Sequence, residues 1–204
     1  GAIIVAYLLG SVPSSIWVGK WFFGVDVRDF GSKNAGATNT FRTIGKRAGF
    51  PVLFFDIFKG WASVYFISKY SSYIAGSDAY INLQMVIGIA AVLGHVFPIY
   101  ERFKGGKGVA TLLGIVLAIN FPAAAVCFGI FVIVYLLSQY VSLGAIVSAA
   151  SFPLVTIFVF KTESNSLIYF SIALAILVVV RHRKNIERLL KHEEGKMPFN
   201  LKKK

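Results

Sequence analysis

The chain has 204 residues, of which 56% are hydrophobic and only 15% are charged, whereas an average soluble domain carries roughly 25% charged residues. Its mean hydropathy is +0.70, and the apolar residues form long blocks, which fits poorly with a soluble protein and indicates membrane helices. The net charge of +12 does not indicate nucleic-acid binding, because the cations cluster between the apolar blocks, where they act as topology signals.

Six apolar stretches follow one another along the chain, at residues 2–23, 50–67, 81–100, 109–137, 143–160 and 167–180. Most of them approach the ~20 residues that cross a bilayer as a helix. The fourth stretch is longer and contains Asn120-Phe121-Pro122 near its middle. It is therefore either one long tilted helix or a hairpin of two short helices.

The placement of positive charge separates these alternatives. Seventeen of the 21 Lys and Arg residues lie in 24–48, 101–108 and 181–204. The positive-inside rule places all three regions in the cytoplasm, which requires a turn at 120–122. We therefore predict an all-α polytopic membrane protein with seven transmembrane helices, the N-terminus outside and the C-terminus cytoplasmic. Residues 1–204 are predicted to form a single membrane-embedded domain, with a basic tail from about residue 181.

The first cytoplasmic loop gathers small residues, hydroxyls and amides around one lysine and one arginine. Backbone N–H groups and polar side chains of this kind donate hydrogen bonds to phosphate oxygens, and an arginine adds a bidentate contact. The same composition is also typical of an ordinary turn between helices, and the loop alone leaves both interpretations open. The candidate phosphate ligands are Ser32, Asn34, Gly36, Thr38, Asn39 and Arg42.

A second loop, at residues 101–111, is rich in glycine and lysine, and we call it the glycine-lysine loop. Glycines permit positive φ angles, which let successive N–H groups converge into an anion-binding nest. Gly108 follows Lys107 and no glycine lies five residues before Gly106, so this is not a Walker A motif and nucleotide hydrolysis is not indicated. The alternative is a flexible basic loop that contacts lipid phosphates. The candidate ligands are Lys104, Gly105, Gly106, Lys107, Gly108 and Thr111.

Ionisable residues also occur inside the predicted spans. Asp56 and Lys59 are three residues apart in the second span, where charged groups are costly and normally pair. We favour a self-neutralising pair that braces the bundle over direct contact with a ligand. His95, near the inner end of the third span, is interpreted as a hydrogen-bonded helix-end residue in preference to a catalyst.

Three polar residues near the inner ends of the last spans complete the candidates. Ser142 has no His or Asp neighbour in sequence to activate it, so we expect it to orient a substrate or cap a helix and not to act as a nucleophile. His182 and Asn185 share a face if the last helix continues past the membrane. We expect no metal and no cofactor.

Five motifs with a distinctive order run through the chain. They are Gly10-Ser11-Val12-Pro13; Gly31-Ser32-x-Asn34-x-Gly36-Ala37-Thr38-Asn39-x-x-Arg42; Gly45-Lys46…Gly49…Asp56…Lys59-Gly60; Gly94-His95-x-Phe97-Pro98…Phe103-Lys104-Gly105-Gly106-Lys107-Gly108-Val109-Ala110-Thr111; and Ser142 with Arg181-His182-x-x-Asn185-Ile186-x-Arg188-Leu189. Together they resemble the bacterial integral-membrane acyl-phosphate:glycerol-3-phosphate acyltransferases. The chain departs from the family pattern at Lys33 and His192, where glycine is usual, and at Ala145, where serine is frequent.

The resemblance implies transfer of a fatty acyl group from acyl phosphate to the 1-hydroxyl of glycerol 3-phosphate. The products would be lysophosphatidic acid and phosphate, in phospholipid biosynthesis. We accordingly expect acyl phosphate, glycerol 3-phosphate and membrane lipid as partners, no nucleic acid, and a monomer. The location is expected to be the bacterial inner (plasma) membrane, with the active site on its cytoplasmic face.

For the chemistry we expect direct transfer without an acyl-enzyme, because an acyl phosphate has a good leaving group and needs mainly positioning and electrostatic stabilisation. Catalytic roles are expected for Lys104, Ser142, His182 and Asn185, with a substrate phosphate oxygen or, alternatively, His182 as the proton acceptor. The rival interpretation is a transporter or exchanger of a small phosphorylated solute. That class would need inverted repeats and broken helices at mid-membrane, and we find neither in the sequence.

Overall fold

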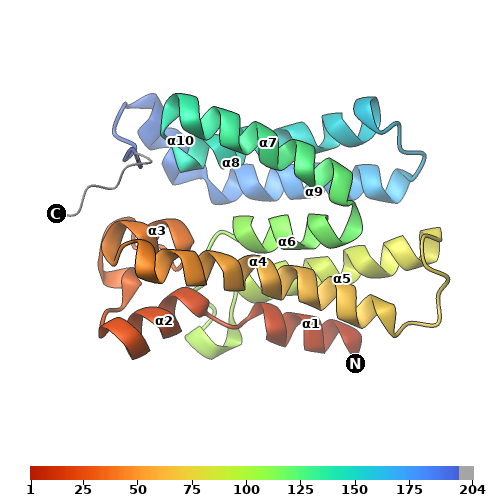
Figure 1. Cartoon of the computed structure of the whole chain (residues 1–204), viewed down its shortest axis with the longest axis horizontal. Coiled ribbons are helices and arrows are strands. Elements are labelled where there is room, and N and C mark those ends of the chain that lie inside the picture. The colour runs from red at the N-terminus through yellow and green to blue at the C-terminus, as the bar shows by residue number, and fades with distance from the viewer. Residues whose placement is uncertain (198–204) are drawn as a thin grey trace. The chain divides into compact units, whose positions relative to one another are not determined.

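The computed structural model describes residues 1–197, and over these residues it contains helices and no strand, as predicted. Lys202, Lys203 and Lys204 of the predicted basic tail lie outside the described residues. The chain divides into two compact units, Gly1–Phe121 and Pro122–Lys204, which are described separately here (Figure 1).

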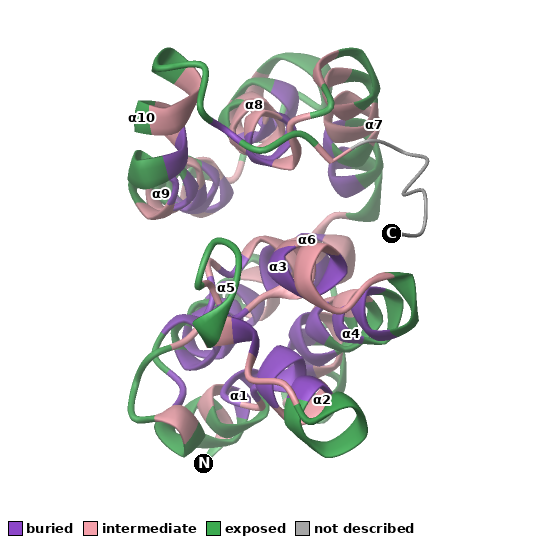
Figure 2. Ribbon diagram, turned by 90° about the vertical axis from the view of Figure 1, so that its left-hand side faces the viewer, coloured by how far each residue is buried: buried purple, intermediate pink, exposed green. Residues whose placement is uncertain are grey.

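The first unit is built from six α-helices and two short 3-10 helices. They are α1 (Ala2–Gly10), α2 (Ser14–Phe23), η1 (Val27–Asp29), α3 (Ala37–Thr43), α4 (Lys46–Lys69), α5 (Asp78–Val96), η2 (Ile99–Glu101) and α6 (Val109–Ile119). The second unit follows with α7 (Phe121–Ser138), α8 (Val141–Leu154), the π-helical turn η3 (Val155–Val159), α9 (Asn165–Arg181) and α10 (Arg183–Leu190). Buried residues gather on the helix faces turned inward within each unit (Figure 2).

Within the described residues, four helical segments are long and apolar enough to cross a membrane: Lys46–Lys69, Asp78–Glu101, Phe121–Ser138 and Val141–Val159. The count rises to six if the bent pairs α1–α2 and α9–α10 are one span each, and α6 is a shorter apolar helix. The break expected at 120–122 is present, since α6 ends at Ile119 and α7 begins at Phe121. Seven spans and the orientation of the termini stay predictions.

The first apolar stretch is a broken helix, not one continuous span. α1 and α2 meet at an angle of 43°, and α9 and α10 meet at 60°. Pro13 causes the first break, because it has no N–H to continue the helix and its ring clashes with the preceding turn. The inference that the chain has no broken helices was therefore wrong. Sequence periodicity did not reveal the break because both halves are apolar.

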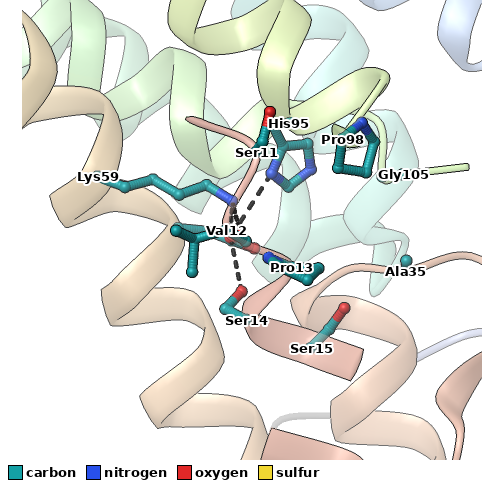
Figure 3. A pocket seen from close by; sticks show the side chains of 12 residues that line it. Ser11, Val12, Pro13, Ser14, Ser15, Ala35, Lys59, His95, Pro98 and Gly105 are labelled. Atoms are coloured by element: carbon teal, nitrogen blue, oxygen red, sulfur yellow. Dashed lines mark hydrogen bonds and ion pairs between the residues drawn. The ribbon is translucent and has the colours of Figure 1, made fainter. Parts of the chain in front are cut away.

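A buried ion pair from α4 fills this break (Figure 3). The Nζ atom of Lys59 donates to the carbonyl oxygen of Val12 at 2.8 Å and lies 2.9 Å from Oδ1 of Asp56. The hydroxyl of Ser14 donates to the same carboxylate oxygen at 2.7 Å. The ammonium thus lies where α1 ends and the carboxylate where α2 begins, which is the arrangement that helix dipoles favour.

α6, the helix into which the glycine-lysine loop leads, packs closely against α4. A Cβ atom at Gly60 would overlap the carbonyl oxygen of Thr111, and one at Gly114 would overlap that of Ile57. Neither position leaves room for a side chain. Glycine therefore lets the backbones of α4 and α6 approach directly, as small residues do in membrane helix pairs.

Replacing Lys59 by methionine should lower the free energy of unfolding by about 3–5 kcal/mol, because it leaves the buried Asp56 carboxylate without its countercharge. Chemical denaturation of the detergent-solubilised protein measures this. The double variant Asp56→Asn/Lys59→Met should lose less, and Lys69→Met, at an exposed position of the same helix, should be close to wild type. A loss at Lys59 no larger than at Lys69 would contradict the bracing role.

Candidate functional site

In the first unit, the chain between α2 and α4 is organised around one buried side chain, Asn39 of α3. Its Nδ2 donates to the carbonyl oxygens of Val27 at 2.6 Å and Phe30 at 3.1 Å. Its Oδ1 accepts from the backbone N–H of Ser32 at 2.9 Å. With 1% of its surface exposed, Asn39 shapes the loop from within. The expectation that it contacts a phosphate is corrected on this ground.

The other candidates in this loop keep access to solvent. Ser32 is exposed, and Asn34, Gly36, Thr38 and Arg42 are partly exposed. Lys33 adopts a left-handed conformation with φ 57°, so the turn is kept although lysine replaces the glycine that such a conformation favours. The loop therefore presents a hydroxyl and an arginine on a backbone held by Asn39.

The glycine-lysine loop begins with a tight turn. Arg102 and Phe103 both have positive φ, at 53° and 61°. The N–H groups of Glu101 and Phe103 donate to the carbonyl oxygen of Pro98, at 3.1 and 2.9 Å, and that of Lys104 donates to Glu101 at 3.1 Å. Lys104 is exposed at the end of this turn. Its position is therefore set by backbone hydrogen bonds immediately before it.

Gly105 and Gly106 do not form the expected nest. Neither has a positive φ, and their N–H groups donate to the carbonyl oxygens of Val96 and His95, each at 3.2 Å. A Cβ at Gly105 would overlap the backbone of His95, and one at Gly106 would overlap its ring and the carbonyl oxygen of Ala35. Both positions require glycine because the loop packs directly against α5. The left-handed conformation occurs at Gly108, with φ 87°.

Thr111, the last residue of the glycine-lysine loop, and His95 of α5 are both buried. The hydroxyl of Thr111 lies 3.1 Å from Nδ1 of His95, and the same nitrogen lies 3.5 Å from Oδ1 of Asp56. Thr111 is fully buried, so the expectation that it contacts a phosphate is corrected. His95 connects the ion pair of α4 to the loop above it, in keeping with its interpretation as a helix-end residue.

A small cavity lies beside this network, between the break in the first span and the glycine-lysine loop (Figure 3). It has room for about one water molecule, which is far too little for a phosphate ester. It is lined by Ser11, Val12, Pro13, Ser14, Ser15, Ala35, Asp56, Lys59, His95, Pro98, Gly105 and Gly106.

In the second unit, a carboxylate from the tail joins three polar side chains. Oε1 of Glu194 accepts from the hydroxyl of Ser142 at 2.9 Å and from Nδ2 of Asn185 at 2.8 Å. Oε2 accepts from Nε of Arg188 at 2.7 Å. The structure thus brings together two of the predicted residues, Ser142 and Asn185, from α8 and α10. The hydrogen-bond partner of Ser142 is thus the Glu194 carboxylate.

His182 lies at the corner between α9 and α10 and is buried. Its Nδ1 lies 2.8 Å from the carbonyl oxygen of Val178. A carbonyl only accepts hydrogen bonds, so Nδ1 carries the proton, and Nε2 is the acceptor nitrogen of the neutral imidazole. A base role for His182 would therefore use Nε2. The 60° bend also means that α10 does not continue along the axis of α9.

The sequence analysis missed Glu194. Burial by itself would raise the pKa of this carboxyl, but hydrogen bonds from Arg188, Asn185 and Ser142 outweigh it and hold the pKa below its ordinary value. No pattern in the sequence singled out Glu194, because the tail from residue 181 also contains Glu187 and Glu193. His192, with φ 57°, turns the chain after α10, and Glu194 N–H then donates to the carbonyl oxygen of Arg188 at 3.2 Å.

Glu194→Gln should lower the unfolding temperature at pH 7, because an amide NH₂ then faces donors that need an acceptor. The folded-state pKa is depressed, so the stabilisation by the ionised group is present above its ordinary pKa of 4.5 and is lost as the pH falls below it. The difference in unfolding temperature between Glu194→Gln and wild type should therefore become smaller below that pH. Glu193→Gln, at the exposed neighbour, is the control, and an equal effect there would contradict the assignment.

Comparisons with known proteins agree on one family. Residues 1–192 match the family model of glycerol-3-phosphate acyltransferase. The chain is 40% identical to a glycerol-3-phosphate acyltransferase of Fusobacterium nucleatum over 198 residues, which cover 97% of each protein. It is 42% identical to one of Staphylococcus carnosus over 199 residues, which cover 97% of this chain and 96% of that protein.

Two solved structures are also similar. Both are crystal structures of PlsY (YgiH), an integral membrane glycerol 3-phosphate acyltransferase, one in the glycerol 3-phosphate form and one in the lysophosphatidic acid form. The first has a TM-score of 0.86 at 38% identity and the second 0.83 at 37%, and each comparison covers 97% of this chain and 94% of the other. The chain therefore belongs to the glycerol-3-phosphate acyltransferase family, whose solved members are integral membrane proteins.

Proposed function

We propose that this protein transfers a fatty acyl group from acyl phosphate to the 1-hydroxyl of glycerol 3-phosphate, and that it releases lysophosphatidic acid and phosphate. The observation that carries the proposal is the glycine-lysine loop, where Lys104 is exposed at the end of a turn fixed by backbone hydrogen bonds. A cation at such a position can bind a phosphate group, and both proposed substrates carry one. The resemblance to a PlsY structure in its glycerol 3-phosphate form supports the choice of acceptor.

The reaction is a single acyl transfer. The 1-hydroxyl oxygen attacks the carbonyl carbon of the acyl phosphate, and a new ester C–O bond forms. The bond from that carbon to the phosphate oxygen breaks, and the phosphate leaves with the bonding electrons. The hydroxyl proton passes to a substrate phosphate oxygen or, in the alternative route, to Nε2 of His182. No acyl-enzyme forms.

We propose roles for the polar residues of each unit separately. In the first unit, Ser32, Arg42 and Lys104 bind phosphate oxygens, and the partly exposed residues Asn34, Gly36, Thr38 and Lys107 complete the lining of the two loops. Gly108 is buried and acts through the left-handed turn that it allows. In the second unit, Ser142 and Asn185 orient a substrate hydroxyl while Glu194 holds both side chains in place. The oxygen of Ser142 accepts a hydrogen bond from that hydroxyl, because its own O–H is donated to Glu194. Gly105 and Gly106 act through packing, because their N–H groups are used within the protein.

Lys104→Ala should lower kcat/KM for acyl transfer by about 100-fold or more, because it removes a cation that binds a substrate phosphate group and stabilises negative charge in the transition state. The assay incubates the purified protein with palmitoyl phosphate and radiolabelled glycerol 3-phosphate and measures labelled lysophosphatidic acid. Lys69→Ala, which removes an exposed lysine at the far end of α4, is the matched control and should be as active as wild type.

Normal activity of Lys104→Ala in detergent would overturn its assignment as a phosphate ligand. Isolation of an acyl adduct on Ser142 would overturn direct transfer. Uptake of labelled glycerol 3-phosphate into vesicles without any lysophosphatidic acid would favour the transporter instead. The broken first span does not favour that class, because the ammonium of Lys59 already occupies the break.

We also propose that the chain crosses the bacterial plasma membrane seven times, with α6 as a short span and both loops in the cytoplasm. In a Cys127→Ser background, a cysteine at exposed Ser72 should react with an impermeant maleimide in intact spheroplasts, and one at exposed Lys33 should react only after permeabilisation. The reverse pattern, or equal labelling, would contradict this topology.

A further inference from the structure

Four alternating charges connect the two loops of the first unit. Nζ of Lys20 lies 3.1 Å from Oδ2 of Asp26. Nη2 of Arg28 lies 2.8 Å from the same oxygen, and Nη1 of Arg28 lies 2.9 Å from Oε2 of Glu101. Arg28 belongs to η1, just before the Ser32–Arg42 segment, and Glu101 ends η2, just before Lys104. The Arg28 guanidinium therefore bridges the two segments that carry the proposed phosphate ligands.

We propose that Arg28 and Glu101 are positioning residues, which hold the glycine-lysine loop in register with the first cytoplasmic loop and thereby set the affinity for glycerol 3-phosphate. This inference rests on the proposed function, since it concerns the same substrate. Neither residue needs to touch the substrate for this role.

On the side of the first loop, Arg28 is held rigidly by Asp26. Its Nε donates to Oδ1 at 3.0 Å and its Nη2 to Oδ2 at 2.8 Å, while its backbone N–H donates to Oδ1 at 3.0 Å. The hydrogen bond from the Arg28 side chain holds the pKa of Asp26 well below its usual range. Such a bidentate pair restricts the guanidinium to one orientation.

The position of Arg28 is passed on to Ser32 by Asn39. Val27, the residue before Arg28, is fully buried, and its carbonyl oxygen accepts from Asn39, which also receives the N–H of Ser32. A displacement of η1 would therefore displace the backbone at Ser32. Arg28 and Ser32 are therefore held in a fixed position relative to each other.

On the side of the glycine-lysine loop, Glu101 anchors the turn that carries Lys104. The carbonyl oxygen of Glu101 accepts the N–H of Lys104 at 3.1 Å. The two residues between them, Arg102 and Phe103, are both in the left-handed region, which is strained for residues other than glycine. A turn that carries this strain needs an anchor, and the ion pair to Arg28 supplies one outside the backbone.

The charges argue for positioning and against phosphate binding by the cluster itself. Two cations face two carboxylates, so the cluster adds no net charge that would attract an anion. Both ends of the Arg28 guanidinium are engaged by carboxylates. The pair is partly buried, with 26% and 16% of the Arg28 and Glu101 side chains exposed, and it joins two loops instead of two packed helices. Its loss should therefore displace the loop more than it lowers the unfolding temperature.

The experiment is a double-mutant cycle with Arg28→Gln, Glu101→Gln and the double variant. Each single variant should raise KM for glycerol 3-phosphate about fivefold or more with kcat nearly unchanged, because a misplaced loop weakens binding of ground state and transition state alike. The double variant should be no worse than the poorer single variant, since both remove one interaction. Controls with the same charge changes at exposed positions are Asp29→Asn and Arg47→Gln, which should match wild type.

Three results would overturn the inference: unchanged KM in both single variants, additive effects in the double variant, or a fall in kcat that follows a lowered unfolding temperature with KM unchanged. The last result would indicate a structural role only. Equilibrium binding of radiolabelled glycerol 3-phosphate without an acyl donor gives a second readout. If wild type binds glycerol 3-phosphate but makes no product from palmitoyl phosphate, the proposed acyl donor is wrong. The positioning role of Arg28 and Glu101 is then still tested by the binding measurement.

Discussion

Within the first unit, the buried pair of Asp56 and Lys59 is the interaction on which the other features depend. The break at Pro13 leaves a helix end and a helix start inside an apolar bundle, where unpaired backbone groups cost several kcal/mol. Lys59 satisfies the carbonyl oxygen of Val12, and Asp56 accepts from Ser14 and pairs with Lys59. His95 lies against the same carboxylate and supports the glycine-lysine loop from below. One ion pair therefore braces both the broken span and the base of the loop.

The glycine-lysine loop separates structural from ligand-binding roles more sharply than its composition suggests. Gly105 and Gly106 pack against His95 with no room for a side chain, and their N–H groups donate hydrogen bonds within the protein. Gly108 alone of these glycines has a left-handed conformation. The group that we propose for phosphate binding is thus mainly the exposed Lys104, on a backbone that is already ordered by hydrogen bonds. Ordering before binding reduces the entropic cost of binding an anion.

The second unit uses a carboxylate of its own to arrange donors. Glu194 receives hydrogen bonds from three side chains on α8 and α10, and so fixes the hydroxyl of Ser142 and the amide of Asn185. The left-handed turn at His192 makes this return of the chain possible. A glycine would adopt that conformation with less strain than a histidine.

Sequence by itself determined the all-helical membrane class, the helix break at 120–122, and the family, because hydropathy, charge placement and motif order are local properties of the chain. It also identified Asp56–Lys59 as a pair, since the two residues are one helical turn apart. Only the tertiary structure decided that the first span is broken, that Asn39 and Thr111 are buried, and that Glu194 reaches Ser142. It alone joined Arg28 to Glu101, residues 73 positions apart in the chain. Such contacts depend on how helices pack and on where hydrogen-bond partners are left over, which no local pattern of residues specifies.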